Sequence, residues 1–150
     1  MKTTQRTFFL YWLPVLALCV VIFVQSSLPS PDLGPAFPLT DKVIHMAAYG
    51  LLALLFYRAC RVTWPGSLSP VQLLAISVCL ASLYGMSDEF HQSFVASRHA
   101  DVMDGVADVA GSILGALGYM WATSRGGGTG YRKRAGDATT VKKASRQKTI

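Results

Sequence analysis

Charged residues are scarce in this chain of 150 residues: they make up 15% of it, whereas soluble domains average about 25%. Hydrophobic residues account for 51% of the chain, and they collect in four blocks, at 8–24, 43–60, 70–84 and 102–122. About 20 apolar residues are needed to cross a hydrocarbon core roughly 30 Å thick. This pattern argues against a soluble domain and predicts an all-α integral membrane bundle of four transmembrane helices.

Cysteine is also scarce, and its placement argues against a disulfide framework. The three cysteines, Cys19, Cys60 and Cys79, each lie inside an apolar block, and none belongs to a Cys-x-x-Cys pair. Thiols in such positions usually behave as small hydrophobic side chains. We therefore expect these cysteines to pack rather than to react.

The basic character of the chain belongs to residues 123–150. The whole chain carries +6, but these residues hold eight of its 14 Lys and Arg and one of its eight acids, so they carry +7 and the remainder −1. Such a segment cannot bury enough apolar surface to fold alone. We predict a membrane domain at 1–122 and a disordered basic cytoplasmic tail at 123–150, held near anionic lipid. Because the tail lacks interleaved aromatic residues, we expect no nucleic-acid partner.

Lys and Arg flank the apolar blocks unevenly, and cytoplasmic connections carry an excess of these residues. The first connection holds Lys42 and the third holds Arg98, each beside acids. The remaining cations near the blocks lie in the N-terminal segment, the second connection and the tail: Lys2, Arg6, Arg58, Arg61, Arg125, Arg132, Lys133 and Arg134. Four spans, with both termini in the cytoplasm, satisfy the bias at every connection.

The first block has a competing interpretation as a cleaved signal peptide. Lys2 and Arg6 precede its apolar core, and Val24-Gln25-Ser26 has the form of a weak cleavage site. The uncharged core is long for a signal peptide, and Pro14 is tolerated in membrane helices. We predict that the block is retained as a membrane helix; its removal would leave the other three orientations unchanged.

Ionisable residues collect between the third and fourth blocks, within 84–104, where they are costly beside hydrocarbon and usually functional. In the predicted topology the second block begins at this same extracytoplasmic face. Its residues Asp41, His45 and Tyr49 are spaced four apart and share one helical face. Ala107, Gly111 and Gly115 form a seam of small residues for close helix contact. We therefore expect residues from 41–49 and from 84–104 to meet.

These residues also carry a family resemblance. The patterns are Asp41-Lys42-x-x-His45-x-x-x-Tyr49, then Ser87-Asp88-Glu89-x-His91-Gln92-x-Phe94, then Arg98 and Asp101-x-x-Asp104. In this order, over 40–118, the chain resembles the VanZ-like membrane proteins. It has Ala96-Ser97-Arg98 where the family usually has Pro-Gly-Arg, and Asp108 where it often has Asn. The resemblance implies a small bacterial multi-span protein, since the family is named after an accessory protein in resistance to teicoplanin, but it implies no reaction.

The polar residues divide into two predicted roles. A histidine titrates near neutral pH and suits general acid–base chemistry, and an arginine fork matches phosphate. The candidate catalytic residues are His45, Asp88, Glu89, His91, Arg98 and Asp104. The candidate substrate-binding residues are Asp41, Lys42, Tyr49, Gln92 and Asp101.

Two other interpretations of these residues stay open. In the first, the network only packs helix ends, with Lys42 paired to Asp104 and Arg98 paired to a neighbouring acid. In the second, histidines and carboxylates hold a divalent ion, but their spacing matches none of the established zinc motifs, so no metal site is assigned.

The sequence therefore predicts a VanZ-like protein acting at the extracytoplasmic leaflet. Its expected partner is an anionic lipid-linked cell-envelope component, such as a phospholipid or a lipid-linked precursor, and its expected effect is on susceptibility to glycopeptide antibiotics. The alternative is a non-enzymatic membrane interaction or scaffold protein. Catalysis and a homo-oligomeric state are left undecided by the sequence.

Overall fold

The computed structural model describes residues 3–28, 40–95 and 101–126. The elements are α1 (Thr3–Thr7), a π-helical segment η1 (Phe8–Trp12), α2 (Leu13–Ser27), α3 (Thr40–Thr63), α4 (Pro70–Gln92) and α5 (Val102–Gly126). No strand occurs within the described ranges, so the all-α prediction is confirmed. The chain divides into two units, Met1–Met120 and Trp121–Ile150, and the description below concerns the first. In the second, the Arg125 guanidinium lies 3.8 Å from the Trp121 ring centroid.

Three helices are long and apolar enough to cross a membrane: Thr4–Ser27, Thr40–Thr63 and Pro70–Gln92. The first two extend three or four residues beyond each end of the predicted block, and α4 begins as predicted at Pro70 but continues eight residues past 84, to Gln92. The block at 102–122 is confirmed as a helix, α5, but its assignment as a fourth span stays a prediction. The predicted boundary between domain and tail at 122/123 is wrong by a few residues, because residues 123–126 continue α5. The rest of the predicted tail, 127–150, lies outside the described residues.

The first helix contains a π-helical turn immediately before Pro14. The Leu13 N–H donates to the Phe8 carbonyl, which is an i to i−5 bond. Proline lacks an N–H, and its ring clashes with the carbonyl four residues earlier. Widening the preceding turn relieves that clash, so the helix continues through the proline.

A tight turn joins α3 to α4. Gly66 adopts a φ of 76°, which glycine reaches without steric cost. Ser69 and Gln72 then form a reciprocal capping box, and Pro70 occupies the first turn. This local chemistry makes α3 and α4 antiparallel neighbours.

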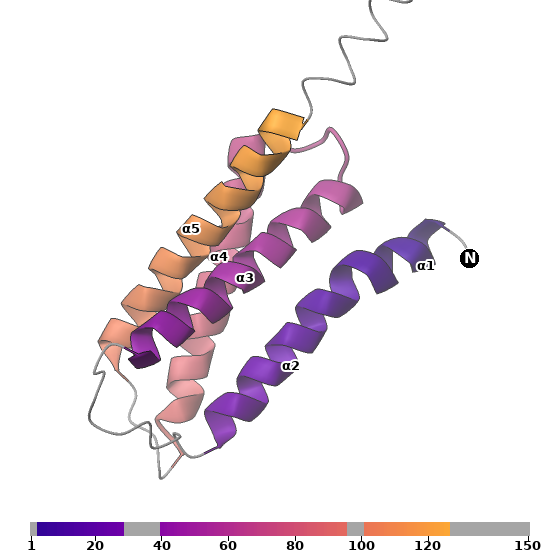
Figure 1. Ribbon diagram of the computed structural model, residues 1–150. Helices are drawn as coiled ribbons and strands as arrows, with labels where there is room; N and C mark the ends of the chain where they lie inside the picture. Colours follow the sequence, from indigo (N-terminus) through magenta and orange to yellow (C-terminus); the bar gives the residue numbers. More distant parts are fainter. Residues whose placement is uncertain (1–2, 29–39, 96–100, 127–150) are drawn as a thin grey trace, which may run out of the picture. The chain divides into compact units, whose positions relative to one another are not determined.

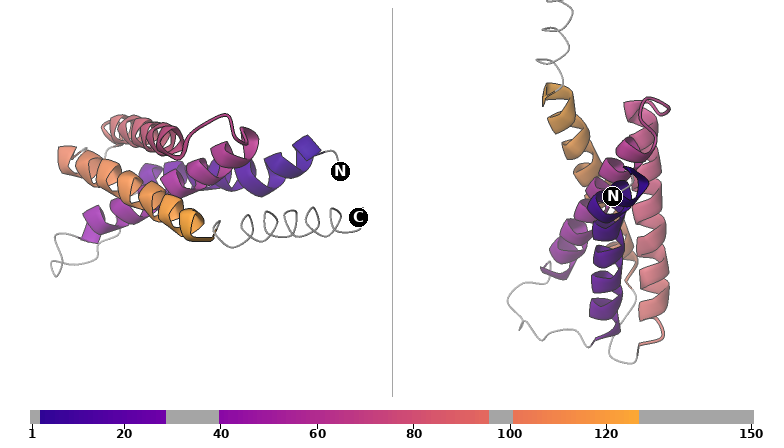
Figure 2. Two further views of the ribbon diagram at one scale, coloured as in Figure 1. Left: turned by 90° about the horizontal axis from the view of Figure 1, so that it is seen from above. Right: turned by 90° about the vertical axis from the view of Figure 1, so that its right-hand side faces the viewer.

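The helix α3 is the centre of the unit, and α2, α4 and α5 pack around it (Figures 1 and 2). At one end, the Trp12 indole N–H donates to Thr63 Oγ1 at 2.9 Å. At the same end the Arg58 guanidinium lies 4.6 Å from the Tyr11 ring centroid. We call this the arginine end, because Arg58 and Arg61 lie in the last turns of α3.

The helices α3 and α5 approach until their backbones touch. A Cβ on Gly111 would lie 2.1 Å from the Met46 carbonyl oxygen, and one on Gly115 would lie 1.9 Å from the Gly50 carbonyl oxygen. Only glycine fits at these two positions. The predicted seam of small residues is therefore confirmed, and it brings the first turns of α5 against α3.

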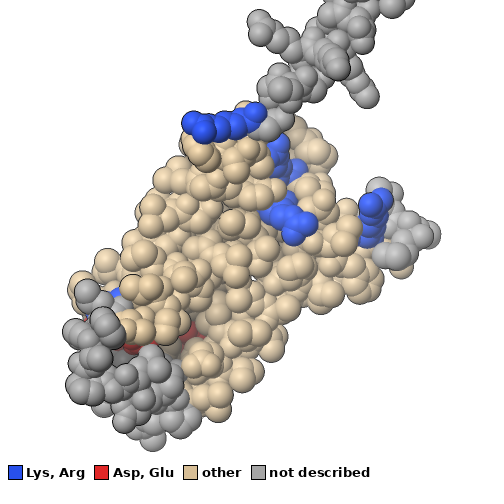
Figure 3. All heavy atoms as spheres, in the orientation of Figure 1, with Lys and Arg blue, Asp and Glu red and all other residues tan. Residues whose placement is uncertain are grey.

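Acidic residues gather at the end opposite the arginine end. All six acids in the described ranges lie there: Asp41, Asp88, Glu89, Asp101, Asp104 and Asp108. For the first unit, Figure 3 shows acidic atoms at this end and an uncharged surface between it and the arginine end. That intervening surface exposes large apolar side chains, as a lipid-facing surface does.

Candidate functional site

Four helices converge at the acidic end and place their polar side chains in contact. We call this group the polar cluster; its members are Ser26, Lys42, His45, Tyr49, Asp88, Glu89, Gln92, Asp101, Asp104 and Asp108. Segments 39 to 63 residues apart in sequence meet here. The predicted meeting of residues from 41–49 with those from 84–104 is thus observed.

Asp88 is a hydrogen-bond acceptor shared by three helices. Tyr49 OH and Gln92 Nε2 each donate to its Oδ2 at 3.1 Å, and Ser26 Oγ donates to its Oδ1. Asp88 is 5% exposed. A buried carboxylate survives only with such partners, so Asp88 joins α2, α3 and α4 at this end.

His45 and Asp108 form a second buried pair, between α3 and α5. His45 Nδ1 lies 3.0 Å from Asp108 Oδ1 and 3.9 Å from Glu89 Oε1. The Asp108 side chain is 1% exposed. A Cβ on Gly85 would lie 2.7 Å from Asp108 Oδ2, so the absence of a side chain at Gly85 leaves room for that carboxylate.

Lys42 joins α3 to the start of α5. Its Nζ lies 2.6 Å from Asp101 Oδ2 and 2.9 Å from Asp104 Oδ1. The hydrogen bond from Lys42 holds the pKa of the Asp101 carboxyl below its ordinary value. The Asp101 side chain also accepts from the Met103 N–H at 2.9 Å, which caps α5. The predicted pairing of Lys42 with Asp104 is confirmed.

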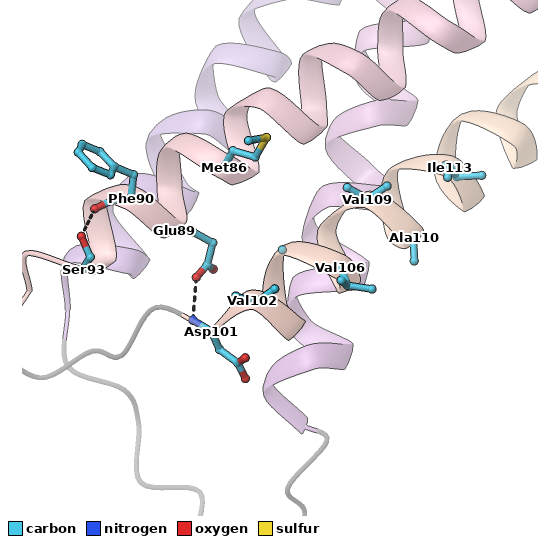
Figure 4. A pocket seen from close by; sticks show the side chains of 11 residues that line it. Met86, Glu89, Phe90, Ser93, Asp101, Val102, Val106, Val109, Ala110 and Ile113 are labelled. Atoms are coloured by element: carbon cyan, nitrogen blue, oxygen red, sulfur yellow. Dashed lines mark hydrogen bonds between the residues drawn. The ribbon is translucent and has the colours of Figure 1, made fainter.

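An apolar groove of about 780 Å³ opens between α4 and α5 (Figure 4). Its walls are Met86, Phe90, Val102, Gly105, Val106, Val109, Ala110 and Ile113. Its polar lining consists of Glu89, Ser93 and Asp101, and the Asp101 N–H donates to Glu89 Oε2 at 3.1 Å. The groove therefore leads from an apolar surface to the polar cluster.

A family model described as VanZ/LLP1 matches residues 6–123. This chain belongs to that family. An uncharacterized protein of Schizosaccharomyces pombe is similar to it, with 31% identity over 104 residues, which cover 69% of this chain and 60% of the yeast protein. The chain thus spans less than two thirds of that relative's length. No solved structure matches it.

The VanZ-like motif residues divide between two neighbourhoods. His45, Tyr49, Asp88 and Glu89 come together, whereas His91 lies against α2, with Nε2 3.0 Å from Ser27 Oγ and its ring 4.8 Å from that of Phe23. Asp41 is exposed at the start of α3. Arg98, predicted to hold an anionic group, lies outside the described residues.

Two members of this VanZ-like cluster are absent from the predicted site residues. Ser26 ends the first apolar block, where the sequence pattern indicates only a span boundary or cleavage site. Asp108 follows Asp104 by one helical turn, and that spacing is the signal that places both on one face. Their partners come from other helices, so neither contact is visible in the sequence.

Proposed function

We propose that this VanZ-like protein acts at the extracytoplasmic leaflet of a bacterial inner membrane, on or with an anionic lipid-linked component of the cell envelope. The observation that carries this proposal is the groove between α4 and α5. Its apolar walls suit a lipid tail, and its polar end at Glu89 and Asp101 opens to the cluster. A lipid lying there has its head group beside His45 and Lys42.

The chemistry proposed for the cluster is proton transfer by His45. His45 Nδ1 lies 3.0 Å from Asp108 Oδ1, and this contact orients the imidazole ring. A histidine held by a carboxylate is a common general acid or base. Two cations are proposed to attract an anionic head group. Lys42 would have to share its charge with Asp101 and Asp104, to which it is paired, so Arg98 is proposed as the main one.

The proposed topology has four spans and cytoplasmic termini. At 1.5 Å per residue, the 25 residues of α5 reach roughly 37 Å, which is enough to cross a hydrocarbon core. Arg58 and Arg61 then face the cytoplasm, as the positive-inside bias requires. In a variant with its native cysteines replaced, Phe94→Cys should react with an impermeant maleimide in intact cells and Ser67→Cys only after lysis; the reverse pattern refutes this orientation.

Lipid binding is tested by blocking the groove. Val106→Trp fills it, whereas Leu114→Trp places the same side chain on an exposed α5 position outside the groove lining. We expect lipid that copurifies with the full chain, quantified by mass spectrometry, to fall for Val106→Trp and to persist for Leu114→Trp. Equal lipid content in both variants would remove the main support for the proposal.

The second candidate function is a scaffold whose cluster only packs helices, and the network around Asp88 favours it. His45→Gln and Glu89→Gln separate the two candidates, because both glutamines keep polar contacts. In cells that depend on the protein for teicoplanin tolerance, the proposed function predicts variants that accumulate normally but lose the phenotype. If the variants lose the phenotype only because they are unstable and do not accumulate, the scaffold function is supported.

A further inference from the structure

Three potential metal ligands from three helices converge at the base of the polar cluster. They are His45 of α3, Glu89 of α4 and Asp108 of α5, and one ligand atom from each lies within 4.8 Å of the other two. His45 Nδ1 is 3.0 Å from Asp108 Oδ1 and 3.9 Å from Glu89 Oε1. Ligands around a transition metal lie at comparable separations, since each is about 2.0–2.2 Å from the ion.

A separate observation concerns hydrogen bonding. Asp108 Oδ2 and Glu89 Oε1 are buried side-chain oxygens with no hydrogen-bond partner among the described residues. The Asp108 side chain is 99% buried, being 1% exposed. A carboxylate oxygen accepts but cannot donate, so an unpartnered one in this position is costly, and a bound cation would remove that cost.

The balance of charges in the cluster also favours a bound cation. Lys42, the lysine of the cluster, is already paired with Asp101 and Asp104. In their ionised forms, Glu89 and Asp108 would place two negative charges beside a single imidazole. One divalent cation bound to a neutral imidazole and two carboxylates neutralises the group completely, and such pairing is what makes buried carboxylates tolerable.

We propose that His45, Glu89 and Asp108 bind a divalent transition metal, with Mn²⁺ or Zn²⁺ as the class of ion. Imidazole nitrogen combined with carboxylate oxygen suits both ions, and three protein ligands leave at least one position for another oxygen. The Asp101 N–H donates to Glu89 Oε2, and this hydrogen bond would orient the Glu89 carboxylate toward the ion. The absence of a side chain at Gly85 leaves the space that Asp108 Oδ2 occupies.

A second set of potential ligands shares His45 with this site: Asp41, His45 and Asp104. Asp41 is exposed, and Asp104 already accepts from Lys42 at 2.9 Å. Its carboxylates are therefore solvated or paired, whereas those of Glu89 and Asp108 each have an unpartnered oxygen. This difference selects Glu89 and Asp108 as the ligands.

The metal proposal does not depend on the proposed lipid function, because metal binding is measured without added lipid. A metal on His45 would replace the proton-transfer role proposed for that imidazole, because a nitrogen bound to the ion cannot also accept a proton. It would, however, remove a difficulty in lipid binding. An anionic head group meets repulsion from the carboxylates of the cluster, and a bound divalent cation would replace this repulsion with attraction.

The experiment uses the full chain, purified in detergent, treated with a chelator and titrated with Mn²⁺. Mn²⁺ is the first probe because it prefers oxygen and nitrogen ligands and so avoids the three cysteines. We expect one equivalent of bound Mn²⁺ by elemental analysis after gel filtration, and a higher unfolding temperature with the ion than without it. Zn²⁺ is titrated in parallel.

The variants decide between the ligand sets. Asp108→Asn and Glu89→Gln should each lose the bound Mn²⁺ and the temperature shift, whereas Asp101→Asn should keep both. If Asp108→Asn does not fold, Glu89→Gln carries the test. The proposal is overturned if the wild-type chain binds no Mn²⁺ or Zn²⁺, if Glu89→Gln binds like wild type, or if Asp104→Asn alone abolishes binding.

Discussion

The two ends of this helical unit handle charge in opposite ways. At the arginine end, Arg61 is exposed and Arg58 lies over the Tyr11 ring. At the acidic end, Asp88, Asp104 and Asp108 are buried and contact side chains from other helices. Exposed cations need no partner, whereas buried carboxylates do, so the acidic end depends more strongly on accurate helix packing than the arginine end.

The contrast also shows where function is best sought. Exposed basic residues beside a span are explained by membrane orientation alone. A buried group of ionisable residues is costly, so it usually persists where binding, catalysis or a satisfied packing network requires it. Four predictions test the contrast between the two ends, from the largest expected effect to the smallest.

The largest effect is expected from separating α3 and α5. In Gly115→Leu the new Cβ would lie 1.9 Å from the Gly50 carbonyl oxygen, so the helices must move apart. We expect a loss of at least about 3 kcal/mol in the free energy of unfolding, measured by denaturation in micelles. Gly118→Leu is the matched control, because nothing lies within 4 Å of a Cβ there. Similar losses in both variants would contradict the close contact.

Removing the centre of the polar cluster should have the next largest effect. Asp88→Ala leaves the donors of Ser26, Tyr49 and Gln92 without their acceptor. We expect a loss of about 2–4 kcal/mol in the same unfolding assay. Tyr49→Phe removes only one donor and should cost about 1 kcal/mol. Equal losses would show that the hydroxyl, not the carboxylate, organises the network.

Substitution at the arginine end should have a smaller effect. Arg58→Ala removes a cation placed 4.6 Å from the Tyr11 ring centroid, and we expect a loss of about 0.5–1 kcal/mol. Arg61→Ala serves as a comparison, because Arg61 is exposed. If Arg58→Ala destabilised the protein as much as Asp88→Ala, the distinction between the two ends would fail.

The smallest effect is expected at the exposed edge of the cluster, in Asp101→Asn. Because Lys42 lowers the pKa of Asp101, this pair stabilises the folded state above the ordinary carboxyl pKa and is lost as pH falls through the lowered pKa. Unfolding midpoints measured between about pH 6 and about pH 3 should therefore depend less on pH in the variant. High salt should shrink the difference at pH 6. An unchanged profile would mean that the pair contributes no stability.

Helix positions were predictable from the sequence because apolar block length and capping residues act locally. Ser69, Pro70 and Gln72 lie within four residues and determine the start of α4 by their own chemistry. The Gly111–Gly115 spacing likewise predicted a close helix contact, since both fall on one face of α5. The contacts of Ser26 were not predictable, because its partner Asp88 is 62 residues away.

Only some of the predicted site residues come together in the folded protein, because the contacts of the others depend on distant helices. Asp88 and Glu89 are adjacent in sequence, yet helical geometry turns Asp88 toward Ser26 and Tyr49 and Glu89 toward His45. His91, chosen for its chemistry, turns toward α2 instead. A motif indicates which residue types are present, but the direction of each side chain depends on the packing of neighbouring helices.

By itself the sequence determined the helical class, the apolar segments, the separation of charges along the chain and the family. These follow from composition and local spacing, which need no knowledge of the folded state. Only the tertiary structure decided that Asp108 pairs with His45, that Asp88 joins three helices, and that Asp108 Oδ2 and Glu89 Oε1 remain unpartnered. These contacts depend on the close approach of α3 to α5, which Gly111 and Gly115 permit because they have no side chain. The sequence shows the two glycines, but the neighbour that they admit is seen only in the folded protein.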